Sequence, residues 1–128
     1  MATGLIKKEG FKSGTYTPTI VSGGTGTVSG TASWKKYGKT VYISTGTLTV
    51  TLSTPTADAL VLSLPFEPTL QQVLPYLYTN STVFNQSNSA AFANTDGIRI
   101  FKGASVKGSD LGTSAHSINC TGSYLTNS

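Results

Sequence analysis

Apolar and polar residues alternate along positions 34–52, the longest strand-like segment in the chain. The sequence Tyr37-Gly38-Lys39 interrupts this segment and predicts a turn between two strands. After the turn, Val41 and Ile43 put apolar side chains on odd positions, whereas beyond Gly46 the apolar residues occupy positions 48, 50 and 52. Because side chains alternate strictly in a regular strand, this change of parity predicts a bulge or bend at Gly46. We therefore predict two antiparallel strands, the second kinked so that it covers a curved core.

The rest of the chain divides into short strand candidates separated by turn signals. We predict strands over residues 15–21, 27–34, 57–64, 91–93, 97–102 and 113–126. Pro18 has no N–H to donate, which places the first of these strands at a sheet edge or Pro18 at the beginning of the strand. Segment 57–64 is apolar on both parities, which indicates a central buried strand. No convincing helix is visible, and the many short strands indicate a single antiparallel β-sandwich or a barrel.

The turns carry residues that tolerate unusual backbone conformations. Glycine-rich residues 22–26 predict a hairpin turn, since they lack the lysine and the helix of a phosphate-binding loop. The pair Asp96-Gly97 predicts a second hairpin. Segment 69–74 fits at most one helical turn between flanking prolines, and residues 103–112 are predicted to be a polar loop.

The predicted core consists of the large apolar side chains on the inner parity of these strands. They are Trp34, Val41, Ile43, Leu60, Leu62, Leu64, Ile98, Ile100 and Ile118. Cys120 is the single cysteine, which rules out an intrachain disulfide and predicts a small buried apolar residue.

Composition supports an all-β chain with few charges. The chain has 128 residues, enough for one domain, with nine basic and five acidic residues. The lysines are scattered and form no basic footprint, so we predict no nucleic-acid partner. No apolar run approaches the length of a membrane helix or a signal peptide, which predicts a soluble protein without membrane insertion that is not exported by the usual route.

The residues that most often carry chemistry do not form a recognisable constellation. Hydrolysis of a glycoside needs two facing carboxylates, but the acids are separated along the sequence and, apart from Glu9, fall in predicted turns or loops. They are Glu9, Asp58, Glu67, Asp96 and Asp110. A zinc site at His116 and Cys120 would need further ligands. We therefore predict no catalytic residues, no metal and no cofactor, although folding could still bring two carboxylates together.

Residues 76–92 combine aromatic rings with amides and hydroxyls. Saccharides stack their C–H faces on rings and hydrogen-bond to amides, so this mixture suits a shallow sugar site. The candidate ligand-binding residues are Tyr76, Tyr78, Asn80, Phe84, Asn85 and Gln86. The alternative is an ordinary loop whose aromatic residues fill the core. The second choice for a binding surface is residues 103–112 with Lys102 and Lys107.

Four short motifs occur in the same order as in a known family. They are Gly14-Thr15-Tyr16-Thr17-Pro18-Thr19, Trp34-Lys35-Lys36-Tyr37-Gly38-Lys39-Thr40-Val41, Leu62-Ser63-Leu64-Pro65-Phe66 and Gly122-Ser123-Tyr124. In these motifs the chain resembles the compact β-domain of bacteriophage tail fibres, tailspikes and related virion proteins. A long fibrous shaft, usual before that domain, is absent from this sequence.

The resemblance implies a jelly-roll-like sandwich that assembles as a homotrimer in the virion, after assembly in the host cytoplasm. It implies a tip domain over residues 14–128 that attaches to a host-surface saccharide or protein. Residues 1–13 would be a lead-in that contacts other virion proteins. Two alternatives remain open: a purely structural trimerisation or head-decoration module, and a glycan-cleaving or glycan-esterase domain.

Overall fold

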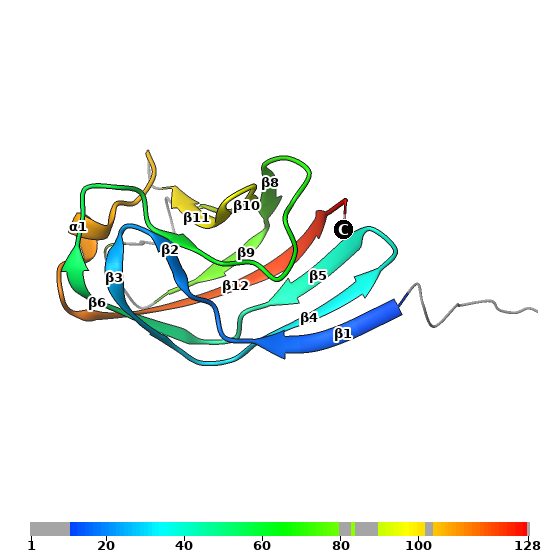
Figure 1. Cartoon of the computed structure of the whole chain (residues 1–128), viewed down its shortest axis with the longest axis horizontal. Helices are drawn as coiled ribbons and strands as arrows, with labels where there is room; N and C mark the ends of the chain where they lie inside the picture. The colour runs from blue at the N-terminus through cyan, green and yellow to red at the C-terminus, as the bar shows by residue number, and fades with distance from the viewer. Residues whose placement is uncertain (1–10, 80–82, 84–89, 102–103, 128) are drawn as a thin grey trace, which may run out of the picture.

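Two antiparallel β-sheets form a β-sandwich-like structure (Figure 1). The computed structural model of the chain describes residues 11–79, 83, 90–101 and 104–127. The larger sheet consists of β1 (Phe11–Tyr16), β3 (Gly24–Ser29), β4 (Ala32–Tyr37), β5 (Thr40–Ser44), β6 (Leu48–Pro55), β9 (Tyr76–Tyr78) and β12 (Ala115–Leu125). The smaller sheet consists of β2 (Ile20–Ser22), β7 (Val61–Leu62), β8 (Gln72–Leu74), β10 (Ala90–Asn94) and β11 (Gly97–Phe101). The prediction of an all-β antiparallel fold is confirmed.

The predicted kink at Gly46 is a one-residue bulge in the middle of the larger sheet. Strands β5 and β6 follow one another along β12. Between the pairs Ser44↔Thr121 and Leu48↔Ile118, the chain advances four residues from β5 to β6 but only three residues along β12. Gly46 has φ of 60°, a left-handed conformation that favours glycine. The extra residue moves the buried set from odd positions in β5 to even positions in β6, so the parity change in the sequence is confirmed as a bulge.

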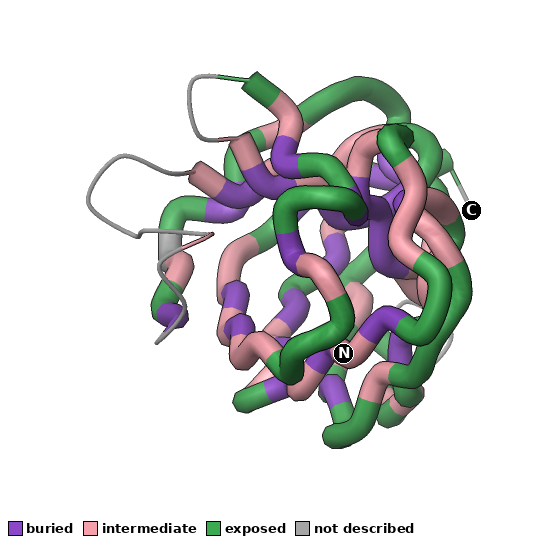
Figure 2. The backbone as a smooth tube through the Cα atoms, turned by 90° about the vertical axis from the view of Figure 1, so that its left-hand side faces the viewer, coloured by how far each residue is buried: buried purple, intermediate pink, exposed green. Residues whose placement is uncertain are grey.

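The core lies between the sheets and contains side chains from both. Most of the predicted core residues are buried, including Leu62, Ile98 and Ile118, and Cys120 is buried with them. Trp34 and Leu64 are only half-buried and pack against the edge of this core. Figure 2 shows buried stretches alternating with exposed ones along the strands, as expected for sheets with one solvated face.

The predicted first strand, 15–21, is wrong as a single element. β1 ends at Tyr16, and β2 begins at Ile20 in the other sheet, so residues 17–19 cross between the layers. Pro18 is buried at this crossing. Pro18 belongs to neither strand, although β1 and β2 each lie at the edge of their own sheet. β1 also begins at Phe11, three residues before the expected domain boundary at Gly14.

Four other local predictions need correction. The glycine-rich turn is shorter than predicted, because Gly24 already begins β3 and packs against the backbone of β6. The possible helical turn at 69–74 is instead β8. The predicted polar loop 103–112 contains a short helix, α1 (Gly108–Leu111). Segment 57–64 contributes only two strand residues, although these lie inside the smaller sheet, between β2 and β11.

Candidate functional site

The outward-facing side chains of β1, β4, β5 and β12 form two rows across the larger sheet. Strand pairing places Thr15, Ser33, Ser44 and Thr121 side by side, and we call these four residues the hydroxyl row. The next pairs along the strands place Ser13, Lys35, Tyr42 and Ser123 side by side, and we call them the mixed row. Their neighbours of opposite parity, such as Val41 and Cys120, are buried in the core. Both rows therefore face solvent.

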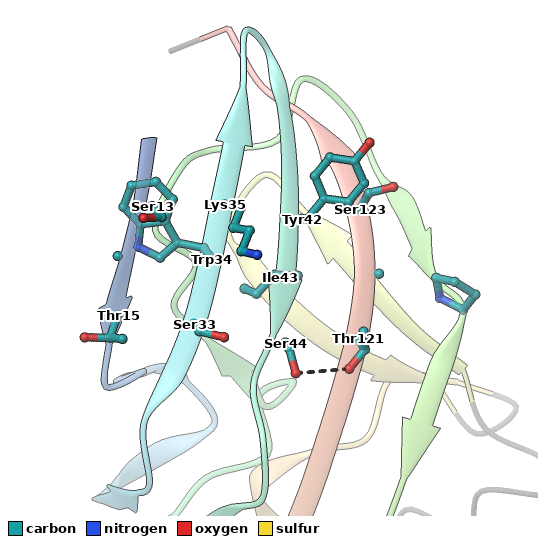
Figure 3. Close-up of a pocket in the computed structure, with 13 residues that line it drawn as sticks. Ser13, Thr15, Ser33, Trp34, Lys35, Tyr42, Ile43, Ser44, Thr121 and Ser123 are labelled. Carbon is teal, nitrogen blue, oxygen red and sulfur yellow. Dashed lines mark hydrogen bonds between the residues drawn. The ribbon is translucent and has the colours of Figure 1, made fainter. Parts of the chain in front are cut away.

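The two rows line an open hollow of about 560 Å³ (Figure 3). The lining is completed by intervening residues of the same strands and by Pro75, which precedes β9. In the hydroxyl row, Thr121 Oγ1 donates to Ser44 Oγ across 3.4 Å. Several other hydroxyls of the two rows are exposed, among them those of Ser13, Thr15 and Ser33. The hollow therefore offers hydrogen-bonding groups at regular strand spacing on a backbone fixed by strand pairing.

Aromatic rings border the hollow on the side toward the β4–β5 turn. The ring centroids of Phe11 and Tyr37 lie 4.7 Å apart, and those of Tyr37 and Tyr42 lie 5.7 Å apart, edge to face. Tyr37 is 47% exposed and Tyr42 is 50% exposed. This aromatic cluster of Phe11, Tyr37 and Tyr42 gives the face flat apolar surfaces beside the hydroxyls, a combination that suits recognition of amphipathic ligands.

The structure places part of the predicted saccharide site on this same face. Tyr78 lies in β9 opposite Asn119, is half-exposed, and shares its parity with Thr121 of the hydroxyl row. Tyr76 pairs through its backbone with Thr121. The other four candidates lie outside the described residues: Asn80, Phe84, Asn85 and Gln86. At the far end of the predicted segment, Phe92 lies in β10 and packs edge to face on Phe101 at 4.8 Å, on the parity opposite to the buried Ala91 and Ala93, so it does not fill the core as the alternative interpretation expects.

The second-choice surface has a local structural role. The N–H groups of Gly108 and Ser109 donate to the carbonyls of Asp58 and Thr56, so this segment anchors α1 to the loop after β6. Lys107 is exposed, and Lys102 lies outside the described residues.

Sequence reasoning missed the two rows because it followed the apolar positions alone. The opposite parity of the same strands carried the signal. Residues 33 and 35 in β4, 42 and 44 in β5, and 121 and 123 in β12 are polar or aromatic at every step. The predicted turn at Gly38 already required β4 to pair with β5. That pairing alone would have brought residue 33 beside 44 and residue 35 beside 42.

Three of the acidic side chains have local partners. Asp96 forms an ion pair with Arg99, and this hydrogen bond lowers the pKa of the Asp96 carboxyl. Asp110 Oδ2 accepts a hydrogen bond from the N–H of Lys107 at the start of α1. Asp58 Oδ2 accepts from the hydroxyl of Thr56. These carboxylates act within turns and a helix cap, as the sequence predicted for most of them.

His116 and Cys120, the two residues considered for a zinc site, lie in different surroundings. His116 Nε2 lies 2.8 Å from the carbonyl oxygen of Leu111, whereas Cys120 is buried in the core, where burial raises the pKa of its thiol to about 12. Among the residues that the structure describes, no three His, Cys, Asp or Glu side chains gather as a metal site.

No family model, curated protein or solved structure matches this chain. Within the described ranges, no helix has the length and hydrophobicity needed to cross a membrane.

Proposed function

We propose that this chain is the attachment domain of a bacteriophage fibre or spike and that it binds a saccharide of the host surface. The observation that carries the proposal is the hollow on the larger sheet, where Tyr42 in the mixed row lies next to the hydroxyl row. The sequence motifs between residues 14 and 124 support the viral context, since they resemble those of virion β-domains.

The chemistry of the face suits a sugar. A pyranose ring presents apolar C–H groups, which stack on an exposed tyrosine ring, and hydroxyls, which exchange hydrogen bonds with serine and threonine. Each such hydrogen bond contributes only about 0.5–1.5 kcal/mol net, because the sugar gives up bonds to water. Binding by one domain would therefore be weak, and several domains on one fibre would strengthen attachment through avidity.

Binding of the purified chain to an array of bacterial surface polysaccharides tests this proposal. Tyr42→Ala should weaken binding by about tenfold, which corresponds to about 1.4 kcal/mol, because it removes the ring at the centre of the mixed row. The matched control is Val21→Ala, since Val21 is 52% exposed on β2 and does not line the hollow. Binding that is equally strong in Tyr42→Ala and wild type would contradict a site in the hollow.

Tyr78 extends the proposed site toward β9. Because Tyr78 shares the outer parity of the hydroxyl row and is half-exposed, Tyr78→Ala should weaken binding of longer oligosaccharides more than binding of single sugars. The affinities of Tyr42→Ala and Tyr78→Ala for a monosaccharide and for its oligomer distinguish the contributions of the two positions. Equal losses for both ligands would place Tyr78 inside the primary site.

A structural role in assembly is the second candidate function. Leu70 and Val73 are 61% and 54% exposed at the β8 side of the smaller sheet, where β8 is the edge strand. We propose that this edge packs against a second copy of the chain in a homotrimer. The jelly-roll-like connectivity and the contact of residues 1–13 with other virion proteins remain predictions of the same resemblance.

Native mass spectrometry at micromolar concentration tests the assembly. We expect three chains for the wild type and dissociation for Val73→Asp, because a carboxylate would lose solvation in the packed interface. Lys12→Asp is the matched control, since Lys12 is exposed on β1 in the other sheet. A wild type that is monomeric would contradict the trimer without affecting the saccharide proposal.

A further inference from the structure

Lys35 is the one charged side chain in the rows that line the hollow. It stands in the mixed row between Ser13 and Tyr42, is exposed, and leans from β4 toward β5 (Figure 3). The other lysines of the larger-sheet strands are Lys12 and Lys36, which have the opposite parity. The Lys36 ammonium donates to the Gly38 carbonyl at 2.6 Å and lies 5.5 Å from the centroid of the Phe66 ring.

Among the residues that the structure describes, no carboxylate opposes Lys35 on this face. The seven strands of the larger sheet contain no Asp or Glu between their first and last residues. The described acidic side chains lie elsewhere, in the turn between β10 and β11, in α1 and in the loops that follow β6 and β7. The ion pair found among the described residues joins Asp96 and Arg99, which leaves Lys35 outside it. The described lining of the hollow therefore carries one charge, the positive charge of Lys35.

We propose that the hollow selects an anionic saccharide and that Lys35 binds its negatively charged group, carboxylate or phosphate. This inference rests on the proposed saccharide function and adds the charge of the ligand. The ammonium supplies three donors on a flexible stem, so it can reach an anionic substituent while the sugar ring rests on Tyr42. The surrounding hydroxyls can donate to or accept from the neutral hydroxyls of the same sugar.

Charge makes the expected affinity sensitive to salt. The site is open to solvent, and the Debye length falls from about 10 Å at about 0.1 M salt to about 3 Å at about 1 M. Binding of an anionic ligand should therefore weaken over that range, whereas binding of a neutral sugar through stacking and hydroxyls should change little.

The experiment compares three immobilised polymers on the full chain: polygalacturonate, poly(glycerol phosphate) and neutral dextran. Four proteins are compared: wild type, Lys35→Met, Lys35→Arg and Lys12→Met. Lys35→Met keeps the aliphatic stem and removes the charge, and should lose about tenfold in affinity for the anionic polymer. Lys35→Arg should retain binding. Lys12→Met removes the same charge from the neighbouring strand on the opposite parity and should bind like wild type.

The outcomes distinguish a failure of this inference from a failure of the proposed saccharide binding. Tighter binding of polygalacturonate identifies a carboxylate, and tighter binding of poly(glycerol phosphate) identifies a phosphate; either result supports the proposal if Lys35→Met abolishes the preference. If dextran binds as tightly as both anionic polymers, or if Lys35→Met binds like wild type, the inference is overturned while saccharide binding stands. If neither these polymers nor the polysaccharide array binds the wild type, both proposals fail. Thermal melting of each variant verifies that the fold is retained.

Discussion

The side-chain amide of Gln72 hydrogen-bonds to the backbone of Leu125 as a neighbouring strand residue would. The N–H of Leu125 donates to Gln72 Oε1 at 2.9 Å, and Gln72 Nε2 donates to the Leu125 carbonyl at 3.2 Å. Gln72 lies in β8 of the smaller sheet and Leu125 ends β12 of the larger one. One side chain thus joins the two layers at the C-terminal end of the chain.

Gln72→Ala should lower the free energy of unfolding by about 1–2 kcal/mol, because it removes the two hydrogen bonds to Leu125 and a third to the Leu70 carbonyl, all of them open to solvent. Gln72→Glu should fall between wild type and Gln72→Ala, since its carboxylate still accepts from the Leu125 N–H but no longer donates. Urea denaturation measures both changes, with the exposed neighbour substitution Gln71→Ala as the control. Equal stability of Gln72→Ala and Gln71→Ala would mean that hydrogen bonds to water replace those of the Gln72 side chain with no loss of stability.

Gly108→Ala should destabilise the fold by about 3 kcal/mol or more, the upper end of the cost of overpacking. A Cβ at this position would lie 1.6 Å from the carbonyl oxygen of Gly23, so the loop before β3 or α1 would have to move. The control is Ser109→Ala, the next residue of α1, which is exposed and should change stability by less than about 0.5 kcal/mol. Chemical denaturation of both variants checks the difference, and similar midpoints would contradict the close contact.

Leu62→Ala should destabilise by about 2–5 kcal/mol, because Leu62 is 2% exposed in the core and its truncation leaves a cavity. Leu125→Ala removes the same atoms from a side chain that is 51% exposed and should have little effect. The difference in melting temperature between the two variants measures how much the burial of Leu62 contributes to stability. An unchanged melting temperature for Leu62→Ala would place that side chain outside the core.

Alkaline pH should destabilise the protein from about pH 9 upward. Burial raises the pKa of Cys120 from 9.0 to about 12 and that of Tyr124 from 10.0 to about 12. The folded state therefore keeps these protons at pH values where the unfolded chain releases them. Their stabilising contribution is complete below about pH 9 and is lost as pH rises toward 12.

Urea denaturation at a series of pH values measures this loss. Cys120→Ala removes the group that titrates first in the unfolded chain, so its stability should decline less steeply between about pH 9 and 10 than that of wild type. Identical slopes for the two proteins would contradict the buried thiol as a source of the pH dependence.

Local patterns predicted the features of the fold that depend on neighbouring residues. The alternation in β11 and β12, the hairpin at Asp96-Gly97 and the bulge at Gly46 each follow from side-chain parity or from backbone preference. The crossing at residues 17–19 gave no such signal, because Tyr16, Pro18 and Ile20 keep one parity on both sides of it. Helix α1 also escaped prediction, since its first N–H groups are satisfied by Asp58 and Thr56, about fifty residues earlier.

The candidate site depended on information that no single segment contains. Ser33 and Ser44 are brought together by one hairpin, but Thr15 and Thr121 join them only through the order of strands in the sheet. Aromatic and amide density in residues 76–92 pointed to Tyr78, which does lie on this face. The central residues Lys35 and Tyr42 were spread over strands that each look ordinary alone.

The bulge at Gly46 has a consequence for how the sequence can change over evolution. Deleting that one residue would restore a continuous register between β5 and β6, and would turn either Val41 and Ile43 or the apolar residues of β6 outward. Single-residue gaps and insertions between Ser44 and Leu48 should therefore be selected against, even though the segment is short and polar. By contrast, the exposed turn at Gly38 lies beyond Tyr37↔Thr40, the last pair of β4 with β5, so residues added there could leave that pairing and the apolar parity of both strands unchanged. Among related chains, a conserved distance between the two apolar sets would identify this fold better than any conserved residue.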